Sequence, residues 1–191
     1  MTYKKTISKE DINKLPRYTF TGKIKLIDRQ EDVNKAIEEL RKHKTLGFDT
    51  ETRAAFKKGE RYDVSLLQLA SESSAYLFRL NKLKKLEELF SLLADPDIVK
   101  AGVAIDDDIK GLQKLSPFEA QGFVELADMA RERKIEKFGL RALVAILLEK
   151  RLSKKAKISN WEKDPLSDAQ IIYAACDATS GLEIYHKLIA L

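Results

Sequence analysis

The amino-acid sequence predicts a single α/β domain, a mixed β-sheet covered by helices. Short apolar runs of strand length come first, helical patterns lie between them, and helices dominate the end of the chain. The 191 residues, 44% of them hydrophobic, are enough for one core. Gly (8) and Pro (4) are sparse and form no linker tract, so we expect no second domain.

Six segments have the length and the apolar or alternating pattern of strands. Polar residues Ser71 to Ser73 predict a hairpin turn between the third and fourth of them. The predicted strands are 22–27, 45–50, 64–70, 75–80, 98–105 and 123–126.

Six further segments carry apolar residues at helical spacing. Pro96 and Pro117 follow the second and third of these segments, where a proline ends a helix. The predicted helices are 32–41, 83–93, 106–115, 127–133, 140–149 and 167–189.

Composition excludes several classes of protein. The apolar runs are too short to span a bilayer, and the first residues form no apolar signal core. A single cysteine, Cys176, excludes an internal disulfide framework and a multi-cysteine zinc site, so we expect a cytoplasmic protein. The net charge of +5 and the pI near 9.1 weakly favour a polyanionic partner such as nucleic acid, although a basic surface also serves solubility.

Asp49 and Glu51 follow the apolar run Leu46-Gly47-Phe48. Carboxylates two residues apart on a strand point to the same face, where both can bind one hard cation. Taken alone, a solvated strand end explains the pair better.

Three consecutive aspartates, Asp106 to Asp108, follow the fifth predicted strand and open a helix. Acidic residues cap free backbone N–H groups at a helix N-terminus, but one would be sufficient. A ligand-binding carboxylate and a capping cluster are equally good explanations of this segment.

Tyr173 and Asp177 lie four residues apart in the last predicted helix, so they share one side of it. Small residues around Asp177 would let this helix approach the sheet closely. An acid at such a contact is costly to desolvate unless it is paired or bound to a metal. An exposed acid beside a core tyrosine remains the simpler explanation of this segment alone.

Together these segments resemble the DEDD 3′-5′ exonucleases that carry tyrosine in the last motif, in particular ribonuclease D catalytic domains and helicase-associated exonuclease domains of the Werner type. The resemblance covers residues from Tyr18 to the end. It rests on LGFDTE (46–51), VSLLQLA (64–70), GVAIDDD (102–108), Ser159-Asn160-Trp161, Pro165-Leu166, Gln170, Tyr173-Ala174-Ala175 and Asp177-Ala178. It implies a ribonuclease H-like fold for residues 18–191, with residues 1–17 as an N-terminal extension.

By position, the resemblance implies metal-binding acids at Asp49, Glu51, Asp108 and Asp177. Tyr173 then falls on the residue that positions the attacking water. The sister group has histidine at the place of Ile172, so the tyrosine subtype fits. One departure is Thr52-Arg53, where many relatives have Trp or Pro, and we expect it to alter the pocket wall.

The implied cofactors are two divalent cations, Mg²⁺ or Mn²⁺, which prefer oxygen ligands. The implied reaction removes nucleoside 5′-monophosphates from the 3′ end of DNA or RNA, single-stranded or recessed. Two other functions fit less well, a catalytically idle nucleic-acid-binding domain and a phosphodiesterase for very short oligonucleotides. The first would be expected to have lost an acid, and all four are present.

Candidate contacts with nucleic acid lie in two basic runs. Lys57, Lys58 and Arg61 follow the first motif, while Lys154 and Lys155 belong to a run that precedes Trp161. Both runs suit a phosphate backbone, although solvated lysine-rich loops explain each as well. Trp161 could stack on a base, but core packing is the commoner role for such a residue.

Overall fold

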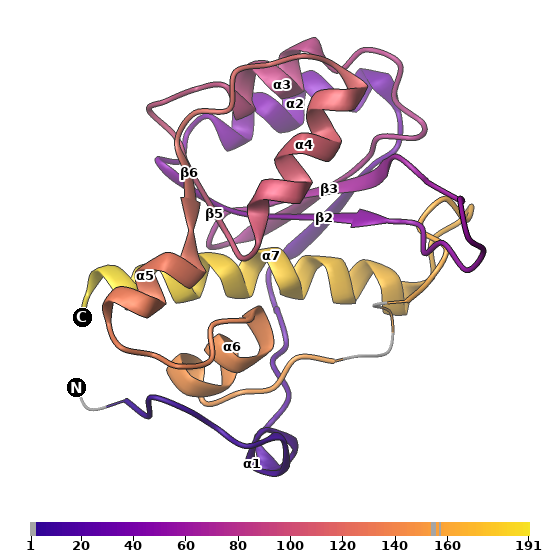
Figure 1. The fold of residues 1–191 in the computed structure, drawn as a ribbon. Helices are drawn as coiled ribbons and strands as arrows, with labels where there is room; N and C mark the ends of the chain where they lie inside the picture. The colour runs from indigo at the N-terminus through magenta and orange to yellow at the C-terminus, as the bar shows by residue number, and fades with distance from the viewer. Residues whose placement is uncertain (1–2, 154–155, 157) are drawn as a thin grey trace.

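The computed structural model describes residues 3–153, 156 and 158–191, which form a mixed sheet with helices on both faces (Figure 1). In these residues the sheet has six strands in the order β1-β4-β3-β2-β5-β6. The strands are β1 (Lys23–Ile27), β2 (Thr45–Thr52), β3 (Val64–Ala70), β4 (Ser74–Arg79), β5 (Val99–Gly102) and β6 (Phe123–Glu125).

Strand β2 lies inside the sheet between an antiparallel and a parallel neighbour. It pairs antiparallel with β3, where Asp49 is opposite Gln68, and parallel with β5, where Gly47 is opposite Ala101. The pairing with β5 ends at Gly47, so the rest of β2 extends beyond that neighbour. Asp49 and Glu51 therefore lie where β2 has a strand on one side only.

Helices cover both faces of the sheet (Figure 1). One face carries α2 (Gln30–Leu40), α3 (Glu87–Leu93) and α4 (Ile105–Leu115), and the other carries α5 (Leu126–Glu132), α6 (Leu140–Leu148) and the long α7 (Asp168–Ile189). Helix α7 crosses the sheet and contacts five of its strands. A short N-terminal helix, α1 (Lys9–Lys14), lies beyond α6.

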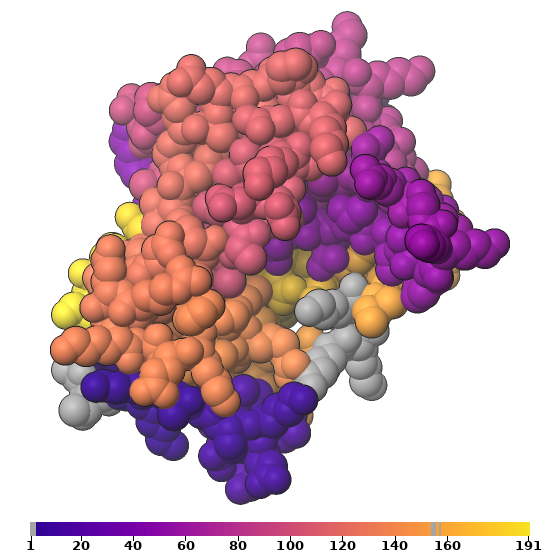
Figure 2. Space-filling view, in the orientation of Figure 1, coloured from indigo at the N-terminus to yellow at the C-terminus, as the bar shows by residue number. Residues whose placement is uncertain are grey.

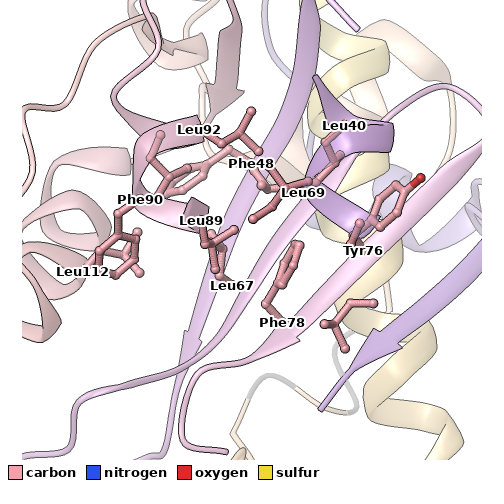
Figure 3. Packing of buried hydrophobic residues seen from close by; sticks show 14 of the residues in the cluster. Leu40, Phe48, Leu67, Leu69, Tyr76, Phe78, Leu89, Phe90, Leu92 and Leu112 are labelled. Atoms are coloured by element: carbon pink, nitrogen blue, oxygen red, sulfur yellow. The ribbon is translucent and has the colours of Figure 1, made fainter. Parts of the chain in front are cut away.

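The largest core cluster fills the space between the sheet and α2, α3 and α4 (Figure 3). Phe48 of β2 points into this cluster and makes an edge-to-face contact with Phe123, with ring centroids 5.1 Å apart. Because side chains alternate along a strand, Gly47, Asp49 and Glu51 face the opposite side, toward α7. Burial of Phe48 thus fixes the direction of the two acids.

The predicted strands and helices are confirmed, with shifts at their ends. The second predicted helix begins at Glu87 rather than Leu83, because Leu83 and Leu86 pack into the core from irregular backbone. The predicted strand 98–105 ends at Gly102, since Ala104 adopts a left-handed conformation (φ 60°) immediately before α4. Helix α1 was not predicted. Of the helices that the structure describes, none is both long and apolar enough to cross a membrane.

Candidate active site

The two acids of β2 lie beside α7 because the backbones of β2 and α7 are in close contact at Gly47 and Ala178. A Cβ atom on Gly47 would lie 2.0 Å from the carbonyl oxygen of Ala178, so only glycine fits there. Ala174, Ala175 and Ala178 are fully buried against the sheet. This contact places Asp177, which is 7% exposed, next to the end of β2.

Tyr173 and Asp177 share one side of α7, as their spacing predicts. The Tyr173 hydroxyl hydrogen-bonds the Asp177 carboxylate. Burial, together with the charges of Asp177, Glu51 and Asp49, raises the pKa of Tyr173 above its usual value. Three carboxylates thus surround one phenol that stays protonated near neutral pH.

Asp108 is the member of the aspartate run that faces β2. Its carboxylate accepts a hydrogen bond from the hydroxyl of Thr50, the residue between Asp49 and Glu51. Burial raises the pKa of Asp108 to about 6, although the bond from Thr50 acts in the opposite direction. Asp106 and Asp107 are exposed to solvent, whereas Asp108 is partly buried against β2.

Glu125 holds the start of α4 in place, a role that the sequence did not reveal. One carboxylate oxygen accepts a hydrogen bond from the backbone N–H of Ile105 (3.0 Å), and the other accepts one from Ala127 (2.8 Å). One side chain therefore caps both α4 and α5 and fixes the strained turn at Ala104.

A cavity of about 570 Å³ opens at this site, a size typical of ligand pockets. Figure 2 shows a hollow on this face, with yellow residues of α7 at its base. The lining includes Asp49, Glu51, Tyr173 and Asp177. Asp108 instead lines an adjoining cavity of about 250 Å³, and Thr50 lines both. The structure thus brings four of the five predicted site residues into one cavity. The fifth, Asp108, lines the adjoining cavity and is linked to the first through Thr50.

The donor set is suited to a hard divalent cation, because all four acids offer carboxylate oxygens and no soft ligand. As the side chains stand, no three acidic, histidine or cysteine residues within the described ranges converge closely enough to hold an ion. The residues therefore fit a metal by the chemistry of their oxygen donors and by their shared location at the end of β2.

The predicted nucleic-acid contacts lie in different settings. Lys57, Lys58 and Arg61 are exposed in the loop between β2 and β3. Trp161 is fully buried and packs against Tyr173 with ring centroids 6.0 Å apart, so the structure shows a packing role for it. Lys154 and Lys155 lie outside the described residues.

At residues 52–53, where the sequence departs from the family pattern, neither residue lines the main cavity, but Thr52 lines the adjoining cavity together with Asp108. Arg53 forms an ion pair with Glu162 (3.0 Å) and stacks over the ring of Tyr62 (4.4 Å). These contacts connect the loop after β2 to the segment that follows Trp161.

Comparisons with known proteins identify the family of this chain. A 3′-5′ exonuclease family matches residues 24–190. The bifunctional 3′-5′ exonuclease/ATP-dependent helicase WRN of Mus musculus is 40% identical over an alignment of 149 residues, and the match covers 75% of this chain and 11% of that protein. The exonuclease mut-7 homolog of Homo sapiens is 31% identical over 177 residues, covering 78% of this chain and 20% of that protein.

Solved structures share the fold at lower identity. The Nibbler EXO domain of Aedes aegypti superposes with a TM-score of 0.82 at 24% identity and covers 91% of both chains. RNase D of Escherichia coli gives a TM-score of 0.79 at 21% identity, covering 87% of this chain and 44% of that one. The chain spans only part of its curated relatives, from 11% to 56% of their length. Because the family match extends over nearly the whole chain, this protein belongs to the 3′-5′ exonuclease family and has its ribonuclease H-like fold.

Proposed function

We propose that this protein is an active, metal-dependent exonuclease that removes nucleoside 5′-monophosphates from the 3′ end of DNA or RNA. One observation carries the proposal: the side chains of Asp49, Glu51, Asp177 and Tyr173 line a single cavity in a chain of the exonuclease family. A domain that only binds nucleic acid would not need this set. The Trypanosoma brucei RNase D, one of the structural neighbours, has been solved with RNA U12, which supports a nucleic-acid strand as ligand.

Four acids are proposed to hold two divalent cations, Mg²⁺ or Mn²⁺. Asp49 would contribute to both sites, Glu51 and Asp177 to one, and Asp108 to the other. When bound, such ions lower the pKa of water and neutralise charge on the phosphoryl oxygens and the leaving 3′ oxygen. The hydrogen bond from Thr50 holds the Asp108 carboxylate beside β2, so this acid is positioned before any ion binds.

Tyr173 is proposed to orient the attacking water. Because its pKa is raised, the phenol keeps its proton at neutral pH and is a poor general base. Its hydroxyl can donate to Asp177 or accept from a water in the cavity, and packing against Trp161 limits movement of the ring. Tyr173 would therefore orient the water, and bound cations would supply its acidity.

A strand labelled at its 5′ end tests this function. Single-stranded DNA, single-stranded RNA and recessed duplex are incubated with Mg²⁺ or Mn²⁺ and with wild-type protein or Asp49→Ala. A ladder that shortens from the 3′ end with wild-type protein only, and that disappears in EDTA, is expected. Equal cleavage by Asp49→Ala, or no cleavage of any strand, would overturn the proposal.

A further inference from the structure

The N-terminal segment, residues 3–17, is fixed to the domain although it lies outside the family match. Ile7 is buried in the core cluster beneath α6 and α7. Backbone hydrogen bonds join the segment to the chain before and after α6: Glu136 N–H donates to the Lys5 carbonyl (2.8 Å), and Arg151 N–H donates to the Pro16 carbonyl (2.9 Å). Helix α1 is therefore held at both ends.

One side of α1 faces the candidate active site. Lys9, Ile12 and Asn13 line the 570 Å³ cavity together with the carboxylates. Spacings of three and four residues place them on one face of the helix. Asp11 points elsewhere, where its carboxylate accepts hydrogen bonds from Ser8 (2.7 Å) and Lys14 (3.4 Å). The face toward the cavity thus presents a cation and an amide.

Helix α6 adds a second cation. Arg141, in its first turn, lines the same cavity. Its Nε atom is buried and has no hydrogen-bond partner in the described part of the chain. A buried guanidinium nitrogen without a partner is costly, and a phosphate in the cavity would give the guanidinium group an anionic partner. Lys9 and Arg141 belong to α1 and α6, whereas the carboxylates belong to β2 and α7.

We propose that Lys9, Asn13 and Arg141 form a strand-binding wall that holds the sugar-phosphate backbone on the 5′ side of the scissile bond. The proposal deepens the proposed function and rests on it. If the scissile phosphate lies at the carboxylates, the terminal nucleotide has no further phosphate on its 3′ side. A phosphate that meets the cations of the strand-binding wall must then belong to a nucleotide upstream.

This role makes a distinct kinetic prediction. The strand-binding wall contributes to binding of a chain and not to the bond-breaking step, so its loss raises KM more than it lowers kcat. Each phosphate contact that is lost also reduces the dependence of binding on salt, by about 0.7 in the slope of log K against log [salt] for a single strand. A purely structural role for α1 would change stability and leave this slope alone.

The test compares Lys9→Ala and Arg141→Gln with a matched control, Lys14→Ala. Lys14 lies on the same helix, has an exposed side chain and does not line the cavity. Kinetics are measured with oligothymidylate of about 12 nucleotides, a length within the usual range for single-strand sites. A p-nitrophenyl ester of thymidine 5′-monophosphate, which lacks upstream phosphates, is the second substrate. Strand affinity is measured by fluorescence anisotropy in the Asp49→Ala background over a range of salt concentrations.

The measured quantity is kcat/KM on the oligonucleotide divided by kcat/KM on the ester. Lys9→Ala and Arg141→Gln are each expected to lower this ratio by about tenfold, the effect of losing one charged contact. The salt slope should fall by about 0.7 for each, and Lys14→Ala should match wild type in both measurements. If both variants keep the wild-type ratio and slope while the wild-type protein cleaves the oligonucleotide, the strand-binding wall is wrong and the proposed exonuclease function stands. Failure of wild type to cleave either substrate would instead remove the proposed function itself.

Discussion

Gly47 and Ala178 make the backbone contact on which the site depends. Gly47 lies two residues before Asp49, and Ala178 directly follows Asp177. A side chain at Gly47 would collide with the carbonyl oxygen of Ala178 at 2.0 Å. The distance between the acids of β2 and the acid of α7 is therefore set by a residue that carries no functional group.

Gly47→Ala is expected to destabilise the protein and to lower its activity at the same time. Overpacking typically costs about 1–3 kcal/mol, and here the obstacle is backbone that cannot rotate away. Gly181→Ala in α7 is the control on the other side of the contact, because its Cβ would lie 3.4 Å from the Ala101 carbonyl oxygen, an ordinary contact. Denaturant unfolding and nuclease assays measure both variants. Wild-type stability of Gly47→Ala would mean that β2 and α7 are not packed as described.

Tyr173→Phe is expected to slow turnover by about 100-fold or more, within the range for a group that positions a proton-transfer partner. Metal affinity should change little, since the phenol is not among the carboxylate ligands. Single-turnover kinetics and Mn²⁺ titration separate the two effects. Weaker Mn²⁺ binding with unchanged turnover would contradict the water-positioning role.

Divalent cations are expected to raise the melting temperature of the wild-type protein. At 100 times the dissociation constant the gain is about 2.7 kcal/mol, or about 5–10 °C for a chain of this size. Asp108→Ala should lose much of this increase in melting temperature. The Asp107 side chain is 98% exposed, so Asp107→Ala should keep the increase. Equal behaviour of the two variants in a Mn²⁺ thermal titration would show that the assignment within the aspartate run is wrong.

Much of this arrangement follows from the sequence, because the signals that matter are local. Apolar runs fixed the strands, and period-two alternation around Phe48 fixes the face on which Asp49 and Glu51 lie. The i, i+4 spacing of Tyr173 and Asp177 predicted their common side of α7. The small residues around Asp177 predicted its close approach to the sheet.

Other features depend on contacts between distant segments. Helix α1 has six residues and buries none of them, so it carries no apolar period. A local signal was present nevertheless, since the Ser8 side chain accepts from the Asp11 backbone N–H as an N-cap. The bridging role of Glu125 and the buried Nε of Arg141 arise only when the chain has folded, and no spacing in the sequence encodes them.

Stability is expected to rise with pH between about 8 and 10.5 because of Lys100. This side chain is fully buried, and its ammonium donates to the Asp95 carbonyl (2.7 Å). Burial lowers the pKa of Lys100 from 10.5 to about 8. Between these values the unfolded chain binds more protons than the folded one, so raising the pH favours folding.

Lys100→Met keeps the apolar stem and removes the titration. The difference in unfolding free energy between wild type and Lys100→Met should therefore shift in favour of wild type as pH rises through this window. Denaturant unfolding at several pH values gives that difference. A difference that stays constant from pH 7 to 11 would contradict a lowered pKa for Lys100.

The most direct test of the central proposal is the identity of the first product. A strand labelled on its 3′-terminal nucleotide is incubated with Mn²⁺, and the released label is resolved by chromatography. Wild-type protein should release a nucleoside 5′-monophosphate, and Asp49→Ala should release none over the same time. Release of a nucleoside or a 3′-monophosphate, or equal release by Asp49→Ala, would contradict the assignment of this site as a metal-dependent 3′-5′ exonuclease.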